Sequence, residues 1–393
     1  MPRKSISIAI LPALFIAVLA GTLSAWGCAS SDDTSSLAIT DLPREQWTWV
    51  PFPQSRCRDG SSTGIGVNLE PGSDGLLIFL EGGGACFNAT TCAGNPSRFG
   101  AEDFAALAGI SCADAGGHKC ASINDGILDR SNPDNPVRSW SFVYVPYCTG
   151  DIHAGDNPAG IVPGLTDGGA ADPQQFVGYT NIGLYLTRLS PTFTSLTRIL
   201  LAGVSAGGFG STANYQQVAQ AFPGTVVDLL DDSGPFLEDP YLATCQQEAI
   251  EQLWAVDRTI LQACGTDCGT PGSALMGDSI HLARLYPHAA FGLLSSEGDS
   301  TTSSFFGFGD LGCNAWQPLI PAQLTAGLLD YEAKLAPYPN AGAFLFPGTD
   351  HTSLQGSTFY TRVAADPRSS DGEVRLTSWV EALIDGSVRN IGP

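Results

Sequence analysis

The stretch LLAGVSAGGFGSTA, residues 200–213, joins an apolar run to a segment that continues as STANYQQVAQAF. We expect a buried strand over 197–203, a sharp turn, and a helix that follows it. The turn holds Ser205 in the pattern Gly-x-Ser-x-Gly. A strand, a turn and a helix around this pattern are the setting of a nucleophile elbow, in which glycines relieve backbone strain and let the helix pass close to the strand. A plain small-residue turn is the alternative.

Short apolar runs alternate with amphipathic segments along the rest of the chain. We expect further strands at 75–80, 141–147, 225–230, 289–296 and 341–346, and further helices at 321–335 and 375–386. Continuous apolar runs are typical of strands that are covered on both faces, and their alternation with helices favours a parallel sheet. The sequence therefore predicts an α/β fold with a mostly parallel central sheet, helices on both faces and many ordered loops. Ligands of such sheets bind beyond the carboxyl ends of the strands.

A serine hydroxyl needs a base, and the chain has five histidines, at positions 118, 153, 281, 288 and 351. When an elbow serine is the nucleophile of such a sheet, the triad order is serine, acid, histidine, which excludes the first two. His281 falls in a predicted helix and His288 precedes a strand. His351 directly follows the last strong strand, in the turn-rich loop FLFPGTDHTSL. We expect His351 to be the base, with a solvated loop histidine as the alternative.

The acid that orients the base must lie between Ser205 and His351. Asp299 follows the strand at 289–296, and the pair Asp231-Asp232 follows the strand at 225–230. The position one strand before the histidine favours Asp299. We expect Asp232 to shape the pocket floor or to orient a loop through backbone hydrogen bonds, and Glu297 is a third candidate.

Backbone N–H groups that could stabilise an oxyanion come from two places. Ala206 follows the candidate nucleophile, and the run LEGGGACF, residues 80–87, places three glycines directly after a strand. We expect Gly83, Gly84 and Ala206 to form an oxyanion hole. A flexible turn is the alternative, and a phosphate-binding loop is excluded because no Lys-Ser or Lys-Thr follows the glycines.

Five motifs occur in one order: FLEGGGACFNATTC, VPYCTGDIHAGD, GVSAGG, LLDDSGPF and NAWQPLI. Together they resemble the pectin acetylesterase/Notum family of α/β-hydrolase-like serine carboxylesterases, over residues 45 to 355. The resemblance implies that Ser205 is the nucleophile, that Asp299 and His351 complete the triad, and that the glycine run and Ala206 form the oxyanion hole. It implies an ester substrate and no metal or other cofactor.

The chain departs from the family pattern at three places. Ala85 stands where an aromatic residue is usual at the end of the glycine run, which is expected to open or reshape the pocket. Thr352 follows the histidine where a cysteine is usual, and the segment EGDSTTSSFFGFGDLGCNAWQ around Asp299 is longer than usual.

The first residues are typical of an export signal, with Arg3 and Lys4 ahead of an apolar run. Gly27-Cys28 before a Ser/Asp tract resembles a bacterial lipoprotein cleavage site. We expect a signal at 1–28, a flexible tether at 29–44 and one catalytic domain at 45–393. The protein is expected to be exported and anchored to a membrane only through a lipid on Cys28, or else to be secreted or periplasmic.

Ten further cysteines form an even set, which in an exported chain predicts disulfides. Their pairing cannot be read from the sequence. The pairs Cys86/Cys92, Cys112/Cys120 and Cys264/Cys268 have spacings that could suggest zinc, but only His118 lies within such a cluster, so no zinc site is expected.

The formal net charge of −21 makes nucleic acid an improbable partner, and it would repel bare polygalacturonate. We therefore expect a short-chain ester, of acetyl type, on a neutral or lightly charged polysaccharide or a small molecule. The alternatives are an esterase for longer acyl chains and a glycan-binding surface lipoprotein without catalysis. Thiol chemistry is disfavoured because disulfides account for an even cysteine set.

Overall fold

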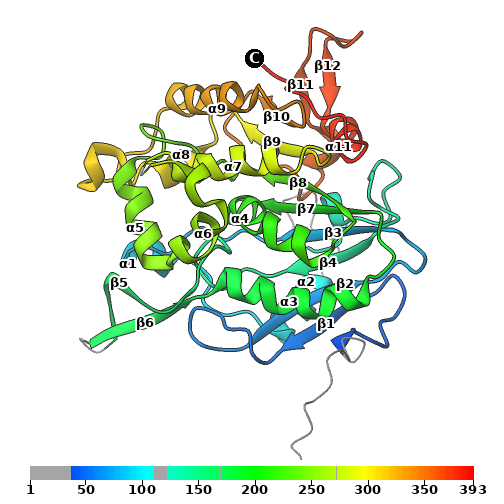
Figure 1. Cartoon of the computed structure of the whole chain (residues 1–393), viewed down its shortest axis with the longest axis horizontal. Helices are drawn as coiled ribbons and strands as arrows, with labels where there is room; N and C mark the ends of the chain where they lie inside the picture. Colours follow the sequence, from blue (N-terminus) through cyan, green and yellow to red (C-terminus); the bar gives the residue numbers. More distant parts are fainter. Residues whose placement is uncertain (1–36, 110–121, 168–169, 271) are drawn as a thin grey trace, which may run out of the picture.

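The computed structural model describes residues 37–109, 122–167, 170–270 and 272–393. Within them, eight strands form a central sheet in the order β1-β2-β4-β3-β7-β8-β9-β10 (Figure 1). Their bounds are Trp47–Phe52 (β1), Thr63–Asn68 (β2), Gly75–Leu80 (β3), Ser141–Val145 (β4), Arg198–Val204 (β7), Val226–Asp232 (β8), Phe291–Ser296 (β9) and Ala341–Phe346 (β10). Strand β2 pairs antiparallel with both neighbours, and every other pairing in this sheet is parallel. The predicted α/β fold with a mostly parallel sheet is confirmed.

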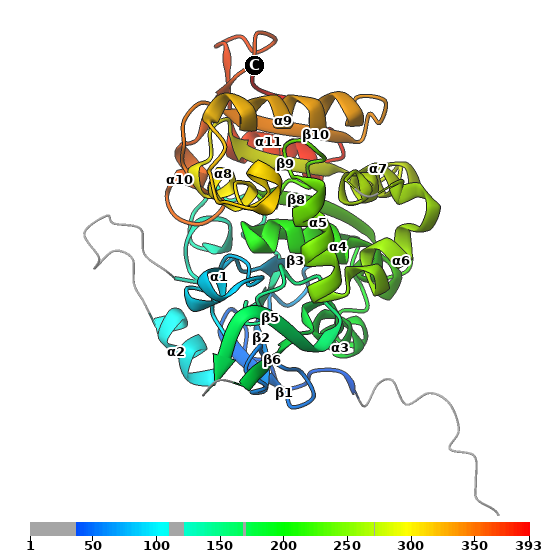
Figure 2. The same ribbon diagram turned by 90° about the vertical axis from the view of Figure 1, so that its left-hand side faces the viewer.

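Helices cover both faces of the sheet (Figure 1, Figure 2). Alternate residues of β3 point to opposite faces, so Ile78 and Leu77 belong to two different core clusters. One cluster includes residues of α3 (Gly178–Thr192), α4 (Ala206–Ala221), α7 (Ala274–Leu285) and α9 (Pro321–Leu335). The other includes residues of α2 (Ala101–Gly109) and α11 (Leu376–Ile384). Burial on both faces explains why these strands are continuously apolar.

Smaller elements fill the loops. The helices are α1 (Ala89–Ala93), α5 (Thr244–Trp254), α6 (Ile260–Cys264), α8 (Ser300–Phe306) and α10 (Thr358–Thr361). Two antiparallel pairs lie outside the central sheet: β5 (Asn157–Asp167) with β6 (Ala170–Phe176), and β11 (Val363–Ala365) with β12 (Glu373–Arg375). None of the helices that the structure describes is long and apolar enough to span a bilayer.

The direction of the chain reverses between β3 and β7, which are neighbours in the sheet. From β3 the chain proceeds to β4 on one side, and from β7 it proceeds to β8 on the other. Open α/β sheets bind their ligands at such a switch point, beyond the carboxyl ends of the strands. The glycine run after β3 and Ser205 after β7 therefore meet where a ligand is expected.

Strand β2 is not among the strands that the sequence predicts, and it contains two glycines, Gly64 and Gly66. A Cβ atom on Gly66 would lie 2.2 Å from the ring of Phe104, so helix α2 packs against the bare backbone there. A glycine inside a strand commonly marks such a close approach.

Within residues 37–44, which the sequence predicts to be part of a flexible tether, Ile39 contacts the domain. Ile39 is buried in the core, and its N–H donates to the Thr192 hydroxyl at 2.7 Å. An apolar side chain in a polar segment gains from such burial. The export signal, Cys28 and residues 29–36 lie outside the described residues and stay predictions.

Four disulfides form among the described residues: Cys57–Cys148, Cys86–Cys92, Cys245–Cys313 and Cys264–Cys268. The predicted use of cysteines in disulfides is thus confirmed, while Cys112, Cys120 and His118 lie outside the described part. Cys86 and Cys92 form one disulfide, and Cys264 and Cys268 form another, so the sulfurs of these two pairs with zinc-like spacing are not thiolate ligands. This holds for Cys264 and Cys268 although the Asp278 carboxylate lies close to them.

Candidate active site

Ser205 lies in a strained turn between β7 and α4. Its φ of +58° is in the left-handed region, which non-glycine residues rarely adopt. A Cβ on Gly203 would lie 2.0 Å from the carbonyl oxygen of Gly207, and a Cβ on Gly207 would lie 2.0 Å from that of Leu80. Both glycines of the pattern are therefore required by the close approach of helix and strands. The structure thus has the strand–turn–helix setting of a nucleophile elbow.

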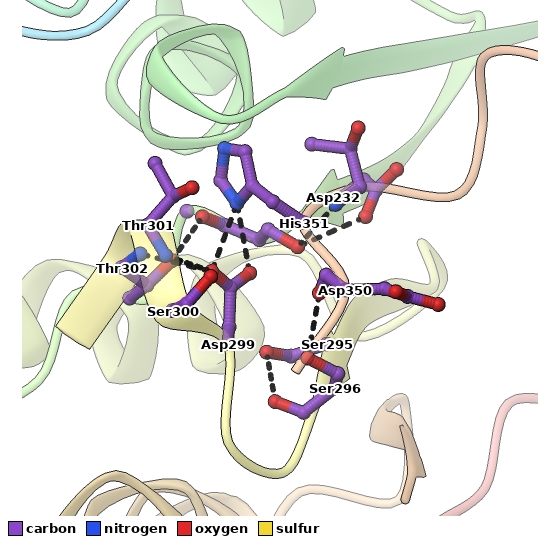
Figure 3. Close-up of polar contacts among 12 residues, drawn as sticks. Asp232, Ser295, Ser296, Asp299, Ser300, Thr301, Thr302, Asp350 and His351 are labelled. Carbon is purple, nitrogen blue, oxygen red and sulfur yellow. Dashed lines mark hydrogen bonds and ion pairs between the residues drawn. The ribbon is translucent and has the colours of Figure 1, made fainter. Parts of the chain in front are cut away.

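Asp299 and His351 meet at the ends of two neighbouring strands (Figure 3). Asp299 follows β9, is fully buried, and its Oδ1 accepts from the N–H groups of Thr301 and Thr302 at 2.9 Å each. Nδ1 of His351 lies 2.8 Å from Oδ2 and 3.0 Å from Oδ1 of the same carboxylate. A carboxylate held in this way favours the tautomer in which Nδ1 carries the proton and Nε2 is free to accept one.

The second ring nitrogen of His351 points away from Asp299 in Figure 3. This Nε2 atom is buried and makes no hydrogen bond to any described residue. Ser205 and His351 line the same two cavities. The only imidazole acceptor that shares a cavity with Ser205, within the described ranges, is therefore the one that Asp299 holds.

Asp232 supports the site through backbone contacts instead. Its Oδ2 accepts from the N–H groups of Ser353 and Leu354 at 2.7 Å each, and its carbonyl oxygen accepts from Ser205 N–H at 2.7 Å. Burial raises the pKa of Asp232 to about 6, although the two backbone donors and His351 oppose the shift. Asp232 therefore ties the elbow to the histidine loop. Orienting a loop through backbone hydrogen bonds is one of the two roles that the sequence led us to expect for it.

The two remaining acidic candidates make other contacts. The Asp231 carboxylate accepts from the Gly234 N–H at 2.8 Å. Glu297 contacts the next strand through its backbone, with its N–H donating to the Phe346 carbonyl at 2.9 Å. Neither carboxylate bonds to His351 among the described residues.

The other described histidines lie elsewhere. His153 is buried with a ring nitrogen 2.9 Å from the carbonyl oxygen of Glu81, and burial lowers its pKa to about 4. His281 pairs with Asp267 at 2.9 Å, and His288 is exposed.

Gly83, Gly84 and Ala206 line a cavity together with Ser205 and His351. The side-chain amide of Asn95 donates to the Gly83 carbonyl at 2.8 Å, and the Tyr147 hydroxyl donates to that of Gly84 at 2.8 Å. In a trans peptide the carbonyl group and the N–H group of the next residue point in opposite directions. Holding the Gly83 and Gly84 carbonyls therefore also sets the directions of the Gly84 and Ala85 N–H groups. Ala206 is the first residue of α4, and the first N–H groups of a helix have no partner within it.

Two cavities flank this centre and share Gly83, Gly84, Ser205, Thr301 and His351. The first, the aromatic cavity, has a volume of about 280 Å³ and is lined further by Ala85, Phe87, Ile152, Phe209, Phe305, Phe308 and Trp316. Ring contacts link Phe87 to Phe305 and Phe308. Trp316 is 55% exposed and so lies at the rim.

The second, the polar cavity, has a volume of about 470 Å³. Its further lining includes Glu81, Ser122, Tyr144, Thr352 and Gln355. The sequence did not lead us to expect that Glu81 and the aromatic residues at 305–316 line these cavities. For the aromatic residues at 305–316, the unusual length of the segment around Asp299 is the sequence feature that could have indicated this.

Comparison with known proteins places the chain in a family. The family model described as Pectinacetylesterase matches residues 51–262, more than half of the chain. The chain belongs to the pectinacetylesterase family. It is thus a member of a family of carboxylesterases, and its disulfides are typical of exported proteins.

Among curated members related to this pectinacetylesterase-family chain is the palmitoleoyl-protein carboxylesterase notum1' of Xenopus laevis, 29% identical over 216 residues. That alignment covers 53% of this chain and 38% of the relative. Human palmitoleoyl-protein carboxylesterase NOTUM is 31% identical over 192 residues, covering 47% of this chain and 34% of the relative. An inactive palmitoleoyl-protein carboxylesterase, notum1b of Danio rerio, is 34% identical over 104 residues, or 26% of this chain and 67% of its own. The chain spans about a third of the length of the first two relatives.

Proposed function

We propose that the protein is a serine carboxylesterase with Ser205 as nucleophile, His351 as base and Asp299 as the residue that orients the base. The hydrogen bond from His351 Nδ1 to the buried Asp299 carboxylate, beside a cavity that Ser205 also lines, carries this proposal. Family membership supports the same reaction class.

The reaction follows from these positions. Ser205 Oγ attacks the ester carbonyl carbon while Nε2 of His351 takes the hydroxyl proton. The carbonyl oxygen becomes an oxyanion, which the N–H groups of Gly83, Gly84 and Ala206 stabilise. The C–O bond of the ester then breaks, and His351 returns the proton to the leaving alcohol. Water repeats the sequence on the acyl-enzyme and releases the acid.

A fluorophosphonate probe tests this assignment and separates an esterase from a glycan-binding protein without catalysis. We expect the wild-type protein to be labelled on the peptide that contains Ser205, and the Ser205→Ala variant to remain unlabelled. Absence of label from a folded wild-type protein, or label elsewhere, would refute the proposal.

For the substrate, the first candidate is the one that the sequence predicts, a short O-acyl group such as acetyl on a polysaccharide or small molecule. The negative net charge of −21 and the hydroxyl, amide and carboxyl groups of the polar cavity support a neutral alcohol. The aromatic cavity favours a second candidate, an ester of a longer acyl chain. Its 280 Å³ approaches the lower limit of about 300 Å³ for small-molecule pockets, so an acetyl group would leave most of it empty.

A series of p-nitrophenyl esters from two to twelve acyl carbons decides between these candidates. A maximum of kcat/KM at acetate supports the first. A rise of about tenfold or more towards six or eight carbons supports the second, because each buried methylene contributes about 0.8 kcal/mol.

A further inference from the structure

An ester at Ser205 has two arms, and two cavities of different chemistry meet at this residue. Aromatic rings line the first cavity, whereas the second combines hydroxyl, amide and carboxyl groups with the apolar side chains of Leu107, Ile123 and Val204. Once one arm lies among the rings, the other arm must extend towards the polar cavity. The assignment of the second arm rests on the proposed function, because Ser205 marks where the ester bond lies.

Glu81 is the charged side chain that distinguishes the polar cavity. It directly follows β3 and directly precedes the glycine run. Its Oε2 accepts from the Tyr147 N–H at 3.0 Å, and the Tyr144 hydroxyl also bonds to its carboxyl group. Its own N–H donates to Val145 at 3.0 Å. Tyr147 and Tyr144 therefore hold the carboxyl group in place rather than leaving it free to turn into solvent.

The carboxyl group of Glu81, a residue that lines the cavity, has hydrogen-bonding capacity beyond its protein donors. A carboxylate has about four acceptor positions, and two protein donors use two of them. No arginine or lysine is among the described residues that line this cavity, and His351 is engaged with Asp299. Burial without a nearby cation raises the pKa of Glu81 to about 7, so near neutral pH the group can accept or donate a hydrogen bond.

We propose that the polar cavity is the alcohol-side subsite and that Glu81 is its recognition residue, binding a hydroxyl group of a neutral, polyhydroxylated leaving alcohol. Glu81 selects such alcohols because a carboxyl group pairs well with a hydroxyl and repels an anion. Thr352 and Gln355 line the same cavity and add neutral partners. An alcohol that carries its own carboxylate, such as a uronate, meets no arginine or lysine among the described residues that line this cavity.

Three esters that share the acetyl group test this subsite, since only the alcohol differs: p-nitrophenyl acetate, a mono-acetate of methyl glucoside and a mono-acetate of methyl galacturonide. In the wild type we expect a higher kcat/KM for the neutral sugar acetate than for the uronate. In Glu81→Ala the kcat/KM for the neutral sugar acetate should fall about 10- to 100-fold, mainly through KM, as expected for a lost hydrogen bond to a carboxyl group. The fall in kcat/KM for p-nitrophenyl acetate should be at least ten times smaller, because its alcohol lacks the hydroxyl group and one such hydrogen bond contributes a factor of about ten or more.

A conservative variant guards against a merely structural effect. In Glu81→Gln the amide oxygen can still accept from Tyr147, so folding should be preserved, which a melting curve checks. This variant should narrow the preference for the neutral over the anionic sugar, because the repulsion of the uronate is removed. Glu332→Gln is the matched control: burial also raises the pKa of Glu332 to about 7, but the residue lies on α9 away from both cavities and should change none of the rates.

Equal losses of Glu81→Ala on all three esters would overturn the subsite, as would a wild-type preference for the uronate. These outcomes differ from failure of the proposed function, in which Ser205→Ala would keep its activity on p-nitrophenyl acetate.

Discussion

The aromatic cavity and the polar cavity share a serine, a histidine and two glycines but little else. The shared residues come from the carboxyl ends of parallel strands, at the switch point between β3 and β7 and after β10. The rings of the aromatic cavity come largely from the long segment after Asp299, and the polar groups come from the end of β3 and the histidine loop. We infer that the sheet positions the proposed reaction centre and that the loops around it determine the acyl and alcohol specificities separately.

The largest effect is expected from a substitution of Ser205, which lines both cavities. Ser205→Ala should lower kcat by about 10⁴- to 10⁶-fold on every ester, whatever its acyl group or alcohol, because the nucleophile is lost. Steady-state rates across the p-nitrophenyl series measure this. A loss that depends strongly on chain length would show that Ser205 belongs to one cavity rather than to the common centre.

Two aspartates at neighbouring strand ends should differ clearly. Asp299→Asn should lower kcat by about 10³- to 10⁴-fold, because the amide no longer favours the tautomer with a proton on Nδ1 of His351. Asp232→Asn is the matched change: an amide oxygen can still accept from Ser353 and Leu354, so its loss in kcat should be at least tenfold smaller. Equal losses in kcat would contradict the assignment of the acid.

Filling the aromatic cavity should affect the acyl arm alone. Ala85→Trp places an indole among the rings that line the cavity, so kcat/KM for an eight-carbon ester should fall about tenfold or more, in line with the loss of two buried methylenes. Acetate should be affected much less, and discrimination between sugar and uronate acetates should be kept. If Ala85→Trp changed the preference between the two sugar acetates instead, the two cavities would not act as separate acyl and alcohol sites.

The smallest effect is expected from the titration of Glu81, which lines the polar cavity but not the aromatic one. The pKa of Glu81 is raised to about 7 in the folded protein, so between pH 4.5 and 7 the folded state holds a proton that the unfolded state releases. Stability from this group is complete below pH 4.5 and is lost as the pH rises through 7. The melting temperature of Glu81→Gln relative to wild type should therefore rise by about 4 °C from pH 4.5 to 8.

The aromatic cavity supplies the control for this shift. Apart from His351, which both cavities share, no acid or base is among its described lining residues. Phe308→Leu should thus change the melting temperature by the same amount at both pH values. A constant difference for Glu81→Gln would mean that its carboxyl group does not titrate in this window.

Local sequence patterns are enough to propose a centre because each part is short and contiguous. The elbow needs only residues 203–207 and the strand and helix around them, and His351 follows from its place after the last strand. The order of strands also brings the ends of β9 and β10 together, which favours Asp299. Asp232 is an alternative in the sequence because it also lies at the end of a strand. Only the hydrogen bonds of the two carboxylates distinguish the role of Asp232 from that of Asp299.

The walls of the two cavities could not be predicted in the same way. Phe87 and Phe305 are far apart in the sequence, and nothing periodic indicates that their rings meet. Glu81 adjoins a glycine run that draws attention to the backbone rather than to its side chain. Which loops face each other depends on tertiary packing, so specificity is harder to infer than the reaction.

The most direct test of this account is a crystal structure of the protein after reaction with a fluorophosphonate that carries an octyl chain. The account predicts a phosphorus bond to Ser205 Oγ, the phosphoryl oxygen facing Gly83, Gly84 and Ala206, and the octyl chain among Phe87, Phe305 and Phe308. An adduct on another residue, or an octyl chain lying beside Glu81, would contradict it.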